Sequence, residues 1–119
     1  MANVKDSLNE LMTMDGALAM ALVDYTSGMM LGSAGGGVDL EVAAAGNTEV
    51  VRAKMKTMKA LGLNDDIEDM LITLGKHYHI MRPVASKPGL FFYVVLDRSR
   101  ANLAMSRRKV LEVEGALTL

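Results

Sequence analysis

The stretch "GALAMALVDYTSGMMLG", residues 16–32, decides the fold. Within it, residues 17–25 alternate large with small apolar side chains, which makes both faces apolar. This pattern predicts a β-strand covered on two sides rather than one with a wet face. The small side chains (Ala17, Ala19, Ala21 and Val23) leave room for another element to pack closely. A turn over residues 25–28 and a short strand over residues 29–32 complete a predicted hairpin.

The glycine-rich run "GSAGGG", residues 32–37, follows the hairpin and precedes a predicted helix. Such loops cradle phosphate groups when they lead from a strand into a helix N-terminus. This run lacks the Lys-Ser or Lys-Thr of a Walker loop and the G-x-G-x-x-G spacing of a dinucleotide fold. We therefore interpret it as a flexible connector.

The longest predicted helix runs from a cap at Asp39 to the region of Gly62. One side has the spacing of a core stripe: Ala44, Thr48, Val51, Met55 and Met58. A neighbouring stripe of mostly small residues consists of Ala43, Gly46, Val50, Ala53 and Thr57. Small residues at this spacing let another backbone approach closely, either the sheet of the same fold or a helix of a second copy. The polar side has Arg52, Lys54, Lys56 and Lys59, which form either a solvated face or a docking patch for an acidic partner.

The remaining elements are predicted from the same patterns. Val4, Leu8 and Leu11 predict a first helix, capped by Asn3 or by a Ser7–Glu10 capping box. Residues 64–75 begin acidic and become a strand, the segment of residues 76–85 follows with a Gly75–Lys76 turn as the next strand, and residues 90–98 form a central strand. A last helix has an apolar stripe at Leu103, Val110, Val113 and Leu117, with Arg107, Arg108 and Lys109 facing water.

The predicted order is helix, two strands, helix, three strands, helix. Tight turns between the strands favour a five-stranded antiparallel sheet with helices on both faces, an α+β fold in one domain over residues 1–119.

Composition excludes several classes of function. The formal net charge of −1 gives no field that would attract nucleic acid, and the absence of cysteine removes disulfides and thiolate chemistry. We expect neither a signal peptide nor membrane insertion, and hence a cytoplasmic protein. Half of the residues are apolar, and a chain of this size has a large surface relative to its volume. We therefore expect a second copy or another partner to cover part of the apolar surface.

His77 and His79 are the only histidines, and as residues two apart on a strand they share one face. Asp69 on the preceding strand is the carboxylate that could join them in a two-histidine, one-carboxylate metal set. A hairpin turn at Gly75–Lys76 would instead place Ile72 opposite His79. Apolar neighbours suit packing better than coordination, so we expect no metal, no cofactor and no catalytic residue. The protein is therefore not expected to be an enzyme.

The first hairpin, the long helix after it and the stretch "GLFFYVVLDRSRANLAMSRRKV", residues 89–110, together resemble the roadblock / dynein light chain family. The resemblance covers residues 4–117. It implies a profilin-like architecture with a five-stranded antiparallel sheet between helices, and pairing through the middle helix and the adjacent strand edge. It further implies partnership with small Ras-like GTPases or a scaffold role in signalling or motility complexes, without catalytic residues.

We therefore hypothesise a dimeric, non-enzymatic interaction module that pairs with itself or with a roadblock paralogue and binds or regulates a small GTPase. The hypothesised dimer interface consists of Ala43, Gly46, Val50, Ala53, Thr57, Met70 and Ile72. The hypothesised docking residues are Arg52, Lys56 and Lys59. The alternative is a profilin-like or PAS-like sensor that binds a small molecule against its sheet, with some of the eleven methionines lining the pocket.

Overall fold

A computed structural model describes residues 2–119 as one five-stranded antiparallel sheet with three helices. The elements are α1 (Val4–Leu11), β1 (Ala17–Asp24), β2 (Met29–Gly35), α2 (Leu40–Ala60), β3 (Met70–Thr73), β4 (His77–Pro83), β5 (Leu90–Asp97) and α3 (Leu103–Ala116). The strand order across the sheet is β2-β1-β5-β4-β3. The predicted α+β fold class and element order are confirmed, and β5 is central as expected.

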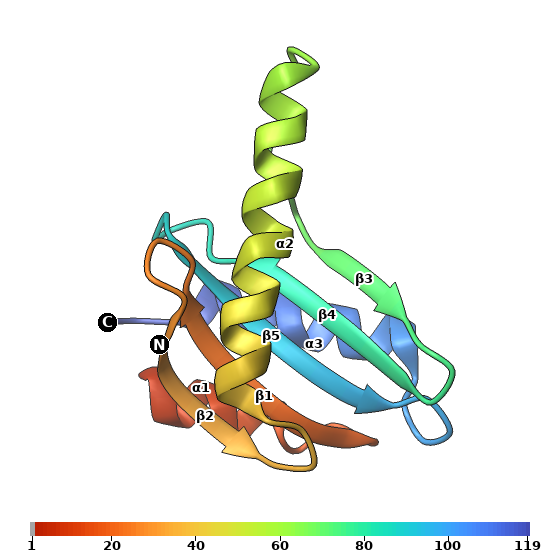
Figure 1. Cartoon of the computed structure of the whole chain (residues 1–119). Helices are drawn as coiled ribbons and strands as arrows, with labels where there is room; N and C mark the ends of the chain where they lie inside the picture. The colour runs from red at the N-terminus through yellow and green to blue at the C-terminus, as the bar shows by residue number, and fades with distance from the viewer. Residues whose placement is uncertain (1) are drawn as a thin grey trace.

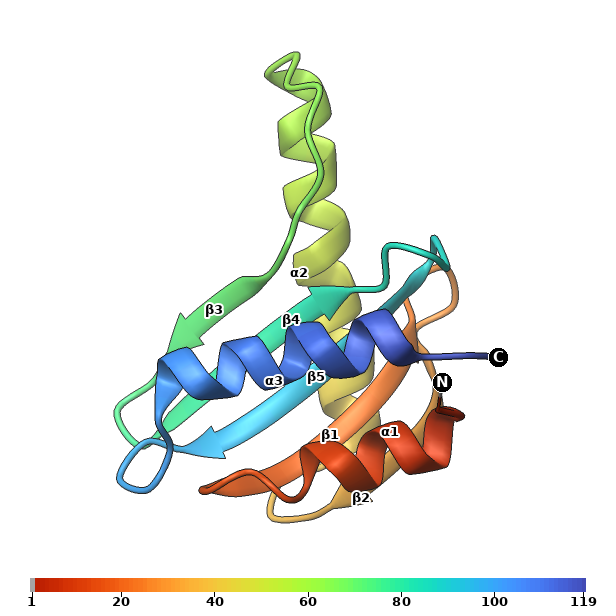
Figure 2. The same ribbon diagram turned by 180° about the vertical axis from the view of Figure 1, so that it is seen from behind.

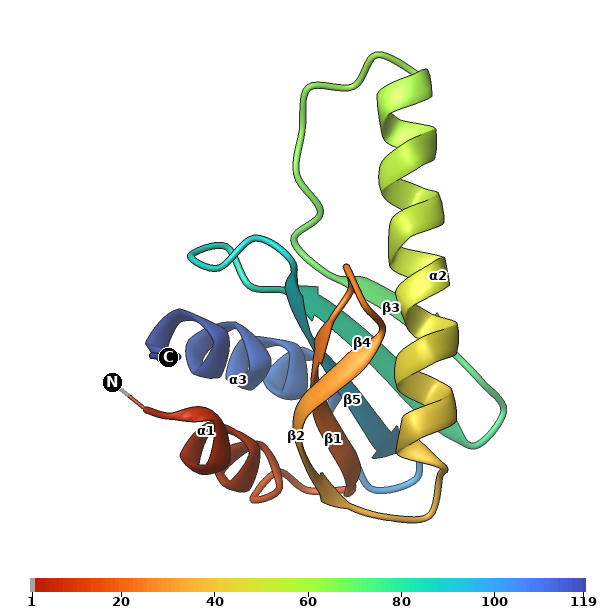
Figure 3. The same cartoon turned by 60° about the vertical axis from the view of Figure 1, so that its left-hand side comes forward.

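The sheet separates two layers of helices. Figure 3 shows α2 on one face and α1 and α3 on the other, and Figure 2 shows α1 and α3 side by side over the sheet. Each face has its own apolar core cluster, one beneath α2 and one beneath α1 and α3. Strands β1 and β5 supply side chains to both clusters, which is why their sequences are apolar on both faces.

The alternation in β1 decides which helix covers which face. Its small side chains Ala19 and Ala21 pack in the cluster with Ala44 and Val51 of α2. Its large side chains Met20 and Leu22 pack in the opposite cluster, with residues of α1 and α3. The predicted close approach on the small face is therefore made by α2 of the same chain.

The first two helices begin at side-chain caps. The Asn3 carboxamide oxygen accepts a hydrogen bond from the Asp6 backbone N–H at 2.8 Å, and the Asp39 carboxylate accepts one from the Val42 N–H at 3.2 Å. Asp39 was predicted as the cap of α2. Of the two alternatives for α1, Asn3 is the cap, and the Ser7–Glu10 capping box is wrong because Ser7 lies buried inside the helix.

Strand β2 is longer than predicted and takes in four of the six residues of the glycine-rich run, so the interpretation of residues 32–37 as a connector is wrong for residues 32–35. Gly32 lies under α1, where an added Cβ would come within 2.9 Å of the Val4 side chain and 3.1 Å of Leu8. Gly35 has a φ of +77°, and a Cβ there would lie 2.1 Å from the Leu18 carbonyl oxygen. These glycines therefore let helix and strand backbones approach closely.

Strand β3 is shorter than predicted, with only residues 70–73 paired to β4. Residues 62–69 run back from the end of α2 to the sheet without regular structure. The expected register is confirmed, since Ile72 lies opposite His79 and the Leu74 N–H donates to the His77 carbonyl at 2.8 Å. Within residues 2–119, no helix is both long enough and apolar enough to cross a membrane.

Candidate interaction surface

Helix α2 extends well past the sheet. Its 21 residues span about 31 Å at 1.5 Å per residue. The fully buried side chains, Ala44, Thr48 and Val51, all lie in its first twelve residues. Met55 and Met58 are half-buried, and Leu61 and Leu63 beyond the helix are exposed. In Figure 1 the C-terminal half of α2 stands clear of the sheet. This half therefore presents apolar side chains that the chain itself leaves uncovered.

The small-residue stripe lies mostly on the outer side of α2. Gly46, Ala53 and Thr57 are exposed, Val50 is 37% exposed, and Ala43 is half-buried at the edge of the core cluster. A Cβ added to Gly46 would meet no atom within 4 Å. A second backbone could approach along this stripe without first displacing a side chain of this chain.

Half of the sheet face on the α2 side makes few contacts with that helix, although Met81 of β4 is buried there in the cluster beneath α2. Helix α2 packs on β1 and β2, at one end of the strand order, whereas β3 and β4 lie at the other. On β3, Met70 and Ile72 face the α2 side and are half-buried, and on β4 His77 and His79 share that face. Strand β3 is an edge strand, so one row of its backbone N–H and C=O groups is free to pair. We call the small-residue stripe of α2, this open half of the sheet face and the β3 edge the α2–β3 surface.

The two histidines form a stacked pair that packs against a tyrosine. The ring centroids of His77 and His79 lie 5.7 Å apart, and Nδ1 of His79 lies 3.0 Å from the Tyr93 hydroxyl oxygen. Nε2 of His79 is buried and has no hydrogen-bond partner among the described residues. Burial, followed by the nearby His77 ring, lowers the pKa of His79 below its ordinary value of 6.5.

The carboxylate that could have joined the histidines is bound elsewhere. Both oxygens of Asp69 accept hydrogen bonds from Arg107 of α3, at 2.8 Å from Nε and 2.7 Å from Nη2. Asp69 is therefore held by a bidentate ion pair rather than placed beside His77 and His79. This pair ties the segment that enters β3 to the opposite layer. Arg107 and Arg108 are exposed as expected, although Arg107 also pairs with Asp69, whereas Lys109 is half-buried and pairs with Glu10 of α1.

The basic residues of α2 lie close to the small stripe. Arg52 is paired with Glu49 at 3.7 Å, and both side chains are exposed. Arg52, Glu49, Lys56 and Ala53 line a shallow hollow of about 450 Å³. Lys59, one turn further on, is exposed but does not line this hollow. The structure therefore brings two of the three predicted docking residues together, next to a residue of the predicted dimer interface. A partner bound over this hollow would contact both sets.

By sequence, the chain matches no protein-family model and shows no significant match to a curated protein. Solved structures match it closely in shape. MglB of Myxococcus xanthus superposes with a TM-score of 0.82 at 20% identity, over 94% of this chain and 89% of that chain. A Roadblock/LC7 domain from Streptomyces avermitilis gives 0.82 at 13% identity, over 97% and 94%. The gliding protein MglB of Thermus thermophilus gives 0.72 at 15% identity, over 94% and 88%.

The chain has the roadblock fold. The resemblance drawn from the first hairpin and the last strand is thereby confirmed at the level of fold. In this roadblock fold, residues 17–24 supply the strand on which α2 rests, and residues 29–35 supply one sheet edge. Identities of 13–20% show the shared architecture, while the partners of this chain have to be inferred from its own surface.

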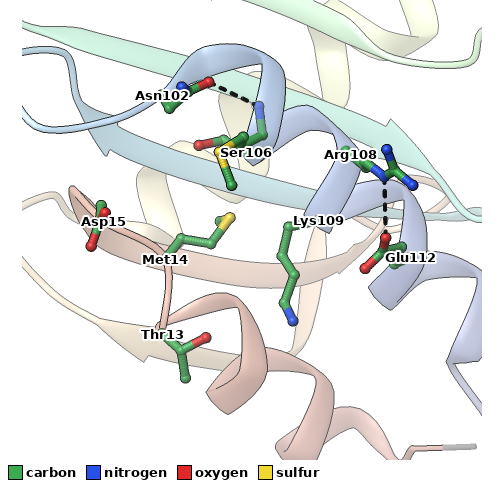
Figure 4. A pocket seen from close by; sticks show the side chains of 9 residues that line it. Thr13, Met14, Asp15, Asn102, Ser106, Arg108, Lys109 and Glu112 are labelled. Carbon is green, nitrogen blue, oxygen red and sulfur yellow. Dashed lines mark hydrogen bonds and ion pairs between the residues drawn. The ribbon is translucent and has the colours of Figure 1, made fainter.

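A second hollow lies on the opposite face of the roadblock fold, between the α1–β1 connection and α3 (Figure 4). Its volume is about 510 Å³. Met14 and Met105 give it apolar walls, and Met105 is 70% exposed. Figure 4 shows Arg108 and Glu112 paired on one side, and Asp15 on another. The sensor alternative placed its pocket against the sheet, whereas this hollow lies at the helix layer.

Sequence patterns did not reveal the ion pairs that join the layers. Arg82 of β4 pairs with Glu114 of α3 at 2.8 Å, and Asp69 pairs with Arg107. The partners are separated by 32 and 38 residues, so no local spacing links them. The one available signal was a charged residue within an apolar stretch, as at Arg82 in "HIMRP".

Proposed function

We propose that this chain is a non-enzymatic interaction module that self-associates through the α2–β3 surface and, as a dimer, binds a small Ras-like GTPase. The observation that carries the proposal is that α2 extends past the sheet, while the sheet face beside it at β3 and β4 makes few contacts with this helix. In a two-fold dimer, the projecting half of each α2 would lie over the open β3–β4 face of the partner. The open β3–β4 face of each copy would thus be covered by the projecting half of α2 from the other copy.

The chemistry of this surface supports self-association. Small residues on α2 permit close backbone approach, and the β3 edge offers unpaired backbone groups that a second β3 could satisfy. Pairing would remove apolar surface from water at two exposed side chains, Leu61 and Leu63, and at two half-buried ones, Met55 and Met58. Removal of apolar surface from water favours association. The interface set proposed is Ala43, Gly46, Val50, Ala53, Thr57, Met70 and Ile72.

The substitution Ala53→Glu tests this interface. Ala53 is exposed on a helix, so glutamate costs the monomer little, but in a close helix contact it would bury a charge. Ala104→Glu makes the same change at an exposed helical position on α3. Light scattering coupled to size-exclusion chromatography should show a dimer for the unaltered chain and for A104E, and a monomer for A53E. A dimer of unchanged mass in A53E would refute the assigned interface.

Small Ras-like GTPases are the partners that the roadblock resemblance implies, and the basic side chains Arg52, Lys56 and Lys59 suit an acidic patch on such a partner. The immobilised dimer would be incubated with lysate of its source cells, once with a non-hydrolysable GTP analogue and once with GDP. Enrichment of one small GTPase in one nucleotide state would support the proposal. The variant Arg52→Glu/Lys56→Glu should retain less of it, whereas equal retention would exclude this docking patch.

A sensor function of a different form, with its pocket at the helix layer rather than against the sheet, is favoured by the hollow between the α1–β1 connection and α3, which is lined by two methionines. A ligand that binds the folded state raises the melting temperature by mass action. A metabolite that stabilises the unaltered chain but not Met105→Lys would favour the sensor function. A metabolite panel that produces no shift would leave the interaction module as the better explanation.

A further inference from the structure

We propose that the stacked pair His77–His79 makes self-association through the α2–β3 surface dependent on pH, with the dimer favoured when both rings are neutral and weakened by acid. The inference rests on the proposed dimer and adds its regulation. The first observation is the position of the two rings, which lie on the half of the sheet face that makes few contacts with α2. His79 lies directly opposite Ile72 of β3, a residue of the proposed interface.

The surroundings of His79 suit a neutral ring. The Tyr93 hydroxyl hydrogen-bonds Nδ1 at 3.0 Å, while Nε2 is sealed from solvent without a partner among residues 2–119. A protonated imidazole has two N–H donors, so one of them would be buried without an acceptor. Burial also raises the pKa of Tyr93, so its hydroxyl stays protonated and provides no counter-charge.

Neighbouring groups offer His79 little compensation for a positive charge. Strand β3 contributes Ile72 and no titratable group, and α2 contributes Asn47 near the Tyr93 hydroxyl, while the charged side chains of α2 are exposed. On β5, Asp97 lies opposite His77 rather than His79, and Lys76 in the adjacent turn adds a like charge. Two imidazolium rings 5.7 Å apart would repel each other.

Association should strengthen this preference. A partner helix over the open face would exclude water from the part of the His79 ring that stays exposed in the single chain, and removal of water penalises the charged form. A group whose pKa falls on association takes up a proton on dissociation, so the dissociation constant rises as the pH falls through the pKa of the free monomer. Each proton taken up contributes about a tenfold weakening per pH unit within that window.

The presence of only two histidines makes the test clean. Sedimentation equilibrium at about pH 7.5 and about pH 5.5 would be run on the unaltered chain, His79→Gln and His77→Gln. We expect the unaltered dimer to weaken at least about fivefold on acidification, His79→Gln to lose most of this dependence, and His77→Gln to show an intermediate response. Far-UV circular dichroism should stay constant, which separates dissociation from acid unfolding. NMR titration of the two imidazole signals, assigned with either variant, should give His79 a lower pKa in the dimer than in the Ala53→Glu monomer.

The outcomes separate this inference from the proposed function. A dimer with equal dissociation constants at both pH values would overturn the pH dependence and leave the dimer intact. An undiminished response in His79→Gln would overturn it as well, as would a loss of helical signal in parallel with dissociation. A chain that is monomeric at every pH would overturn both proposals. A normal His79 pKa in the dimer would contradict the inference even if His79→Gln failed to fold.

Discussion

Breaking the ion pair between Arg82 of β4 and Glu114 of α3 should destabilise the fold strongly. Nε of Arg82 lies 2.8 Å from Oε1 of Glu114, and the two side chains are only 13% and 7% exposed. Glu114→Ala would leave the guanidinium between sheet and helix without a counter-charge. A buried charge without a partner carries its desolvation cost uncompensated, so the loss exceeds that of a surface pair.

The expected size follows from burial. Removal of one partner of a buried pair costs about 3 kcal/mol of unfolding free energy or more. For a chain of 119 residues this corresponds to a fall in melting temperature of about 10 °C. Helix α3 supplies a matched control in Arg108 and Glu112, which are 3.5 Å apart with 81% and 60% exposure. Glu112→Ala should cost about 0.5 kcal/mol or less.

Urea denaturation followed by circular dichroism would measure both variants at fixed protein concentration, because dimerisation would shift the midpoint. The double variant Arg82→Met/Glu114→Met should recover most of the stability lost by Glu114→Ala, since paired apolar groups remove the uncompensated charge. An uncompensated buried charge is refuted if Glu114→Ala costs no more than Glu112→Ala, or if the double variant is less stable than Glu114→Ala alone.

Three further predictions concern other parts of the fold. Gly35→Ala should cost about 2 kcal/mol or more in thermal denaturation, because it combines strain at a φ of +77° with a backbone clash, whereas Gly36→Ala, next to it in open space, should cost much less. Asp69→Asn should raise hydrogen exchange in residues 62–73 by releasing Arg107, with a stability loss of about 1 kcal/mol or less; unchanged exchange there would contradict an anchoring role. Hydrogen bonds from Ser99 lower the pKa of Asp97 below 3.8, so the stabilisation that the Asp97 carboxylate contributes to the fold is present above that pH and is lost as the pH falls further. Asp97→Asn should flatten the acid end of the curve of stability against pH, and a curve of unchanged slope would count against this role of Asp97.

Local patterns predicted most of the architecture because each one reports burial along a single element. The alternation in β1 showed two covered faces, the apolar run at residues 90–97 marked the central strand, and Asp39 marked the start of α2. The glycine run misled because the same residues serve loops and close packing. Only the position of α1 over Gly32 distinguishes the two.

The candidate site was harder to predict because it depends on which part of the sheet face is left uncovered by a helix. The stripe of small residues on α2 was visible in the sequence, and the structure places most of it at the surface. That α2 packs mainly on β1 and β2 and leaves much of the β3–β4 face open follows from strand order, which no local pattern encodes. The histidine pair was correctly assigned to one strand face, yet its contact with Tyr93 depends on a register set 14 residues away.

The sequence by itself determined the elements, their order and which of their faces are apolar, because these depend on side chains a few residues apart. The tertiary structure decided which charges meet across the layers, which glycines permit close packing and which half of the sheet stays uncovered. Those features arise between segments distant in the chain, where the balance between desolvation and pairing depends on the assembled geometry.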